Sequence, residues 1–107
     1  TPTFDPRYKP AVRIDNPADG AVFNLGETVL IDFTATVQLG GIERVELRRF
    51  DQVVDLLPGG NQPVFQNVFV YQPDTTGTYT LDVIAYARDA QGDLAASDPV
   101  TLTILVQ

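Results

Sequence analysis

Three stretches of the sequence alternate apolar and polar side chains with a period of two. They cover residues 29–37, 79–87 and 100–106, and Val, Ile, Leu, Ala and Thr fill most of their positions. Successive side chains of a β-strand point to opposite faces, so this alternation predicts strands that each bury one face. The β-branched residues suit a pleated, half-buried surface. Such strands must cover one another's apolar faces, which predicts an all-β fold.

Shorter strands are predicted at residues 11–15 and 64–71. Turn-forming Gly, Pro, Asn and Asp separate these runs, and they cluster at residues 16–20, 40–41, 58–63, 73–77 and 89–92. This spacing is typical of a sandwich of antiparallel strands. Residues 1–10 carry three prolines and no apolar period, so we interpret them as an extended linker. Residues 11–107 are then a single domain.

Residues 42–57 fit two structures. Their helix-forming residues and their spaced apolar positions are compatible with a helix. However, Val45 and Leu47 alternate with charged residues, as in a strand, and Asp51-Gln52 suits the turn of a hairpin. The alternation favours the hairpin, and the helix remains the alternative.

The residue types that the sequence lacks exclude several classes of site. Histidine and cysteine are absent, so the chain can form neither a Ser-His nor a Cys-His pair, nor a zinc site with imidazole or thiolate ligands. The net charge of −7 repels phosphate backbones and anionic lipid, which argues against nucleic-acid and membrane partners. Paired carboxylates could in principle cleave glycosides, but a small sandwich uses its interior for its own core. We therefore predict no enzymatic activity and no cofactor.

A motif at the start of the second alternating stretch points to a known class of sandwich. It reads Asp74-x-x-Gly77-x-Tyr79 and resembles the corner of immunoglobulin-like domains, where the tyrosine hydroxyl bonds back to nearby backbone. Further motifs resemble those of bacterial immunoglobulin-like domains, and together they cover nearly all of the chain from Pro10 onward. They are the turn at residues 17–20, Gly26-Glu27, residues 41–47 and the hairpin motif at residues 85–92.

This resemblance implies an immunoglobulin-like β-sandwich of about seven antiparallel strands with Greek-key connections. It also favours the hairpin at residues 42–57. We expect one sheet to hold the strands around Val12, Ile31 and Phe69, and the other to hold those around Val45, Val53, Val83 and Leu102. The expected core comprises Ile14, Val29, Ile31, Phe33, Ala35, Val45, Leu47, Phe69, Leu81, Val83, Ala85, Leu102 and Ile104.

The turn after residue 88 has a structural and a metal-binding interpretation. In the first, Asp89 accepts from the N–H groups of its own turn, and Gly92 adopts a left-handed conformation. In the second, Asp89 and Asp93 are oxygen ligands of calcium. Too few other acids are expected at that end of the sandwich to complete a cage, so we predict no metal site.

One outward-facing strip is the candidate contact surface. Tyr86 and Ile84 point away from the core, and we expect Leu105 on the neighbouring strand to extend the strip. Arg44 and Arg48 are expected on the adjacent strand, where stacking on Tyr86 would block a sugar from that ring.

The resemblance implies a non-catalytic spacer or protein-interaction module within a larger secreted or surface-attached bacterial protein. The expected partners are neighbouring domains of the same polypeptide, with a surface protein or a glycan as further candidates, and the module is expected to be a monomer. The expected location is extracellular or at the cell surface. The alternative function is a carbohydrate-binding or adhesin module that accompanies an extracellular enzyme.

Overall fold

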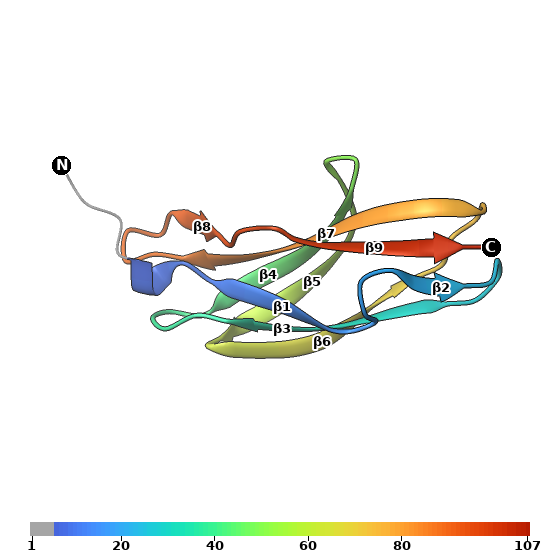
Figure 1. Ribbon diagram of the computed structural model, residues 1–107. Coiled ribbons are helices and arrows are strands. Elements are labelled where there is room, and N and C mark those ends of the chain that lie inside the picture. The colour runs from blue at the N-terminus through green and yellow to red at the C-terminus, as the bar shows by residue number, and fades with distance from the viewer. Residues whose placement is uncertain (1–5) are drawn as a thin grey trace.

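The computed structural model describes residues 6–107, and most of them lie in β-strands (Figure 1). A short 3-10 helix, η1 (Pro6–Tyr8), comes first. None of the described segments forms a helix that is long and apolar enough to cross a membrane. The strands are β1 (Ala11–Asn16), β2 (Ala21–Phe23), β3 (Val29–Thr36), β4 (Ile42–Arg49), β5 (Gln52–Gln62), β6 (Val64–Tyr71), β7 (Gly77–Arg88), β8 (Leu94–Ala96) and β9 (Val100–Val106).

The strands form two sheets that pack face to face. One sheet has the order β1-β3-β6, and the other has the order β2-β9-β7-β4-β5, with β8 paired to β7. The pairings are antiparallel except that of β2 with β9, which is parallel. Within residues 6–107 the chain changes sheet five times, at the connections β1–β2, β2–β3, β3–β4, β5–β6 and β6–β7, and such crossings are typical of Greek-key sandwiches. The predicted sandwich and its division of strands between the sheets are confirmed.

Residues 42–57 belong to the β4–β5 hairpin, so the helical alternative is wrong. Val45 and Leu47 are buried in the core, and the residues between and beside them face outward. The turn consists of Phe50 and Asp51, one residue earlier than predicted, because Arg49 pairs with the first residue of β5.

β5 continues through residues 58–62, which the sequence predicts as a turn. Gln62 pairs with Ile42, so the two strands remain side by side to the end of the hairpin. Gly59 is buried, and a Cβ atom there would collide with the carbonyl oxygen of Ile42. Glycine therefore permits close approach of two strands here, rather than a reversal of the chain.

The short strands β2 and β8 have no visible signature in the sequence. Each has three residues, which are too few to show a period. β2 nevertheless matters for the architecture, because it extends the larger sheet alongside the last three residues of β9.

The core lies between the two sheets. All the predicted core residues are buried except Ile14, which is only half-buried because β1 is the edge strand of its sheet. Phe33 and Phe69 stack at its centre, with ring centroids 4.9 Å apart. The core also contains five buried residues that were not among those predicted: Val37, Ile42, Tyr79, Ala87 and Val106.

The described part of the predicted linker, residues 6–10, is packed against the domain and is not a free extended segment. Residues 1–5 lie outside the described residues, whereas residues 6–10 contact the domain. The N–H of Leu39 donates to the carbonyl oxygen of Arg7 at 2.9 Å, and Lys9 forms an ion pair with Asp98 at 3.0 Å. Pro10 is buried. Composition indicated an extended segment here, but local hydrogen bonds and burial fix it to the sandwich.

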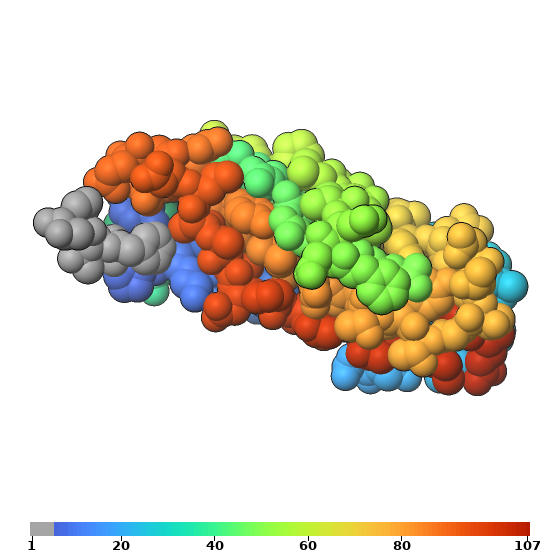
Figure 2. Space-filling model, turned by 90° about the horizontal axis from the view of Figure 1, so that it is seen from above, coloured from blue at the N-terminus to red at the C-terminus, as the bar shows by residue number. Residues whose placement is uncertain are grey.

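The sandwich is long and narrow, with extents of 50 × 23 × 18 Å. Its η1 end lies at one pole, and Gln107, which follows β9, lies at the other (Figure 1). A view from a second side shows the same elongated body, with the β4–β5 hairpin raised on its surface (Figure 2).

Candidate functional site

The predicted contact surface on the outer face of β4 and β7 is a network of charged side chains around Tyr86. The register places Arg44 opposite Tyr86 and Glu46 opposite Ile84. The Glu46 carboxylate accepts from Arg44 Nε at 2.9 Å and from Arg48 at 2.6 Å. Arg48 also donates to the Tyr86 hydroxyl at 2.9 Å. The polar groups of these side chains therefore bind one another.

Glu46 is only 4% exposed although it lies on an outer face. Burial alone would raise the pKa of its carboxyl, but hydrogen bonds from Arg48 and Arg44 outweigh burial and hold that pKa below its ordinary value of 4.5. Burial raises the pKa of the Tyr86 phenol, and the Glu46 charge raises it further. Both groups thus keep one protonation state near neutral pH, as in a structural network rather than an acid–base pair.

The same network covers one face of the Tyr86 ring, the predicted platform for a sugar. The Arg44 guanidinium lies 4.3 Å from the centre of the Tyr86 ring and covers one of its faces, in the stacked arrangement that the sequence allowed. Stacking on that face is therefore blocked.

The predicted strip of Tyr86, Ile84 and Leu105 is wrong in its third member. Leu105 pairs with Thr78, six residues before Ile84 along β7. At about 3.3 Å per residue, the two positions are roughly 20 Å apart along the strand. The alternation of side chains shows which face a residue occupies, but it does not show where along the neighbouring strand the residue lies.

The corner before β7 is held by Tyr79. The Tyr79 hydroxyl donates to the carbonyl oxygen of Thr75 at 2.8 Å and accepts from the N–H of Thr75 at 3.2 Å. Gly77 adopts a φ of 137°, which favours glycine. Asp74 is exposed in the same loop. These bonds attach the loop between β6 and β7 to the buried Tyr79 ring, so the role of Tyr79 is structural.

Asp89 organises the turn between β7 and β8. Its Oδ1 accepts from the N–H groups of Gln91 and Asp93, both at 2.9 Å. Its carbonyl oxygen accepts from the N–H of Gly92, whose φ is 83°. One of the two carboxylate oxygens of Asp89 is therefore engaged with backbone N–H groups, as the structural interpretation expects. Within residues 6–107, no three acidic, histidine or cysteine side chains gather as a metal site would require.

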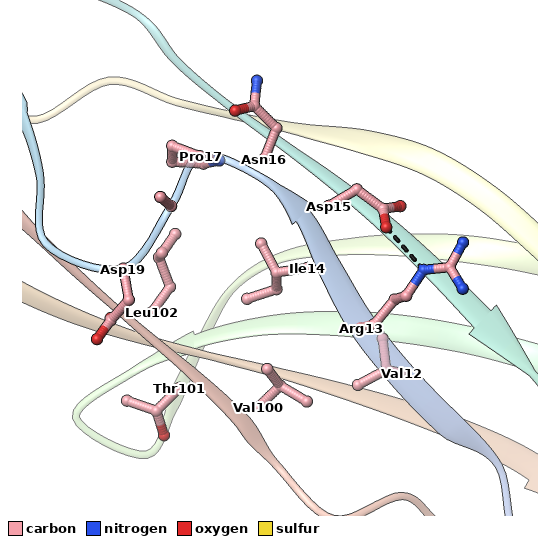
Figure 3. Close-up of a pocket in the computed structure, with 11 residues that line it drawn as sticks. Val12, Arg13, Ile14, Asp15, Asn16, Pro17, Asp19, Val100, Thr101 and Leu102 are labelled. Atoms are coloured by element: carbon pink, nitrogen blue, oxygen red, sulfur yellow. Dashed lines mark hydrogen bonds and ion pairs between the residues drawn. The ribbon is translucent and has the colours of Figure 1, made fainter.

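An open groove of about 500 Å³ separates the edges of β1 and β9 (Figure 3). Val12 and Ile14 line it from β1, and Val100 and Leu102 line it from β9. It exists because β1 pairs only with β3, while β2 covers only the last residues of β9. The groove is therefore the open side of the sandwich, with an apolar floor.

The acids beside this groove are already engaged. Asp15 accepts from the Thr34 hydroxyl and from Arg13, both at 2.7 Å, and these two bonds lower its pKa. Asp19 accepts from the N–H of Thr103 at 2.7 Å. The general acid of a glycosidase needs a raised pKa, so Asp15, whose pKa is lowered, does not suit that role.

Sequence reasoning missed the exposed aromatic residue at the tip of the β4–β5 hairpin. Phe50 is 81% exposed and has a φ of 54°, and Asp51 follows with a φ of 61°. This conformation is costly for a bulky side chain, and Asn-Gly usually occupies such turns. The Arg49 guanidinium lies 4.8 Å from the Phe50 ring centre and 4.2 Å from that of Tyr79. The sequence did not single out Phe50, because an apolar residue there also fits the helical pattern.

Comparison with known proteins agrees with this geometry. The family model for the bacterial Ig domain matches residues 10–104. The fibronectin(III)-like modules of CbhA from Clostridium thermocellum match with a TM-score of 0.73 and 26% sequence identity. The match covers 94% of this chain and 47% of that chain, so this chain spans about half the length of that structure. No curated protein matches the chain in sequence.

Two more distant structures share the fold alone. The CARDB domain of a Pyrococcus furiosus protein matches with a TM-score of 0.63 and 13% identity, over 92% of this chain and 94% of that chain. The PKD domain of an M14-like peptidase from a Thermoplasmatales archaeon matches with a TM-score of 0.60 and 19% identity, over 92% of each chain. Since the family model covers nearly the whole sandwich, the chain belongs to the bacterial immunoglobulin-domain family.

Proposed function

We propose that this domain is a non-catalytic spacer, with protein interaction as a secondary role, in a larger bacterial protein that is secreted or attached to the cell surface. Domains of this family occur as modules of larger proteins and are typically non-catalytic. The observation that carries the proposal is the elongated body, 50 Å long, whose described ends lie at opposite poles. Such a unit separates whatever is joined to its two ends.

Hydrogen bonds at both poles support this role, because a spacer must hold its ends in place. At one pole, Leu39 binds the backbone of Arg7. At the other, the N–H of Gln107 donates to the carbonyl oxygen of Phe23, and the N–H of Leu25 donates to that of Gln107, both at 2.9 Å. The ends are thus fixed to the packed body.

Carbohydrate binding is the rival role. Its predicted platform, Tyr86, is covered by Arg44, and Asp15 and Asp19 near the groove are bound to other groups. Phe50 at the hairpin tip offers an exposed ring, but a protruding tip lacks the concave surface and converging polar groups of most ligand sites. These contacts support the spacer over the rival.

Small-angle scattering from tandem copies tests the spacer. We expect two copies joined head to tail to be longer than one copy by nearly the 50 Å long axis. Two copies joined by a long Gly/Ser linker serve as the control, because that linker behaves as a flexible coil. An increase no larger than the 23 Å width would mean that the copies pack side by side, and it would contradict the proposal.

A further inference from the structure

We propose that this domain associates with a second copy of itself, with the tip of the β4–β5 hairpin of one copy in the groove between β1 and β9 of the next. The tip is residues 49–51, and the groove is the one drawn in Figure 3. This contact between copies does not depend on the spacer role. The monomer expected from the sequence is then the state of the dilute protein.

The tip presents an aromatic side chain that the fold itself does not use. Phe50 is 81% exposed and lies outside the core, and its φ of 54° is costly for a bulky residue. The hairpin projects beyond the neighbouring strands, so the ring is accessible to another molecule (Figure 1). A side chain held in a costly conformation without burial points to a role in binding.

The groove offers an apolar space that suits a phenyl ring. Val12, Ile14 and Val100 line it and are half-buried, so each still exposes apolar surface to solvent (Figure 3). Its volume of about 500 Å³ is large enough for one aromatic ring, and it is open on the solvent side. Placing the Phe50 ring there removes apolar surface of both copies from water, which favours the contact.

The charges on either side of Phe50 match those of the groove. Arg49 stacks on two rings, and its buried Nε has no hydrogen-bond partner among the described residues. Asp19 and Arg13 lie on opposite sides of the groove, and both are exposed (Figure 3). A Phe50 ring in the groove can therefore bring Arg49 toward Asp19 and Asp51 toward Arg13, so that each charge meets its opposite.

The tip and the groove belong to opposite edges of the molecule, so the contact must join different copies. In the larger sheet β5 is one edge, and β9 lies toward the other, with β7 and β4 between them. Each contact uses the tip of one copy and the groove of the next, and such head-to-tail contacts form open rows. The net charge of −7 on each copy is screened beyond about 8 Å at physiological ionic strength, so short-range contacts decide.

Small-angle scattering from the full chain over a range of concentrations tests the association. One ring in an open groove buries a small area, so we expect a weak contact that forms at millimolar concentration. The average mass should then rise past that of a dimer, because the rows are open. A mass that stays at that of one chain, or that stops at a dimer, would overturn the proposal.

Two variants locate the contact on the tip. Phe50→Asn with Asp51→Gly, the tip variant, removes the ring and suits the turn, so we expect a folded protein that stays monomeric. Val70→Asn is the control, because Val70 is 61% exposed and lies on β6, away from tip and groove, and it should associate like the native chain. Native-like association of the tip variant, or an equal loss in both variants, would overturn the proposal. Tandem copies built from the tip variant measure the spacer length without this contact, so the two proposals can fail separately.

A mixture of two complementary variants gives the sharpest test. Val100→Lys places a charge in the groove, and its aliphatic stem can keep the packing while the amine reaches solvent. Neither this variant nor the tip variant should associate alone, but their mixture should form heterodimers and stop there, since one intact tip and one intact groove can meet.

Nuclear magnetic resonance of the mixture identifies the surface. Amide signals of the isotope-labelled tip variant should shift along β1 and β9 when unlabelled Val100→Lys is added, and those of its own hairpin should not. The native chain replaces Val100→Lys as the added protein if that variant does not fold, because its tip is intact. An absence of shifts, or shifts confined to other strands, would overturn the proposal.

Discussion

At the residue scale, Tyr79 shows how one polar atom can fix a corner around a buried ring. Its hydroxyl both donates to and accepts from the backbone of Thr75. We expect Tyr79→Phe to lower the free energy of unfolding by about 1 kcal/mol, because the ring stays in place and only this hydrogen bonding is lost. Urea unfolding followed by circular dichroism measures the change. Unchanged stability would mean that the hydroxyl does not hold the corner.

Glu46 is the second residue whose contribution to the free energy of unfolding can be measured separately, and this contribution depends on pH. Its carboxyl has a lowered pKa in the folded state, so ionised Glu46 stabilises the fold above the ordinary value of 4.5, and this stability is lost as pH falls through the folded pKa. Glu46→Gln should cost about 2 kcal/mol at neutral pH, since Arg44 and Arg48 lose a charged partner.

The pH dependence distinguishes loss of charge from loss of packing. We expect the stability difference between Glu46→Gln and the native sequence to shrink as the pH falls below 4.5. Urea unfolding at a series of pH values measures it, with Glu27→Gln, an exposed glutamate outside the network, as the control. A difference that stays constant with pH would show that the carboxylate charge is not responsible.

At the element scale, the β4–β5 hairpin carries a turn that its sequence suits poorly. Phe50 and Asp51 both have positive φ, where Asn-Gly is the favoured pair. We expect the double change Phe50→Asn with Asp51→Gly to raise the free energy of unfolding by about 1 kcal/mol, because the strained backbone is relieved. Thermal and urea unfolding measure the change. A less stable variant would show that stacking of Phe50 on Arg49 outweighs the strain.

A strand can be predicted from the sequence when it is long enough to show several alternating apolar and polar residues. β3, β7 and β9 are long and half-buried, so their alternation is visible in the sequence. β2 and β8 are too short to show it. The strand predicted for β5 is too short, because Gly59 and its neighbours resemble a turn until the backbone of β4 is seen beside them.

The candidate site was only partly predictable for a similar reason. Arg44 and Tyr86 can be assigned to adjacent strands because both lie in visible alternating patterns, and their stacking follows from the register. Leu105 was misplaced because register depends on the connections between strands, which alternation does not encode. Arg44 and Arg48 flank Glu46 on its own strand and share its face, so this part of the contact follows from the alternation. The contact with Tyr86 comes from β7, and the local pattern of β4 does not show it.

At the scale of the whole molecule, the elongated shape is the property on which the proposed spacer role rests. The radius of gyration is 14.8 Å, whereas a compact domain of this length would have about 13 Å. The excess comes from strands that run along one axis and from ends at opposite poles. This elongated shape is the feature on which the proposed spacer role depends.

The distance between the two poles tests the central claim most directly. Spin labels attached at Lys9→Cys and Gln107→Cys allow the distance between the poles to be measured in solution by double electron–electron resonance. The native chain has no cysteine, so only these two positions are labelled. A rigid sandwich predicts a single narrow distance distribution not far below the 50 Å long axis. A broad distribution, or a peak at less than half that length, would contradict the account of this domain as a spacer.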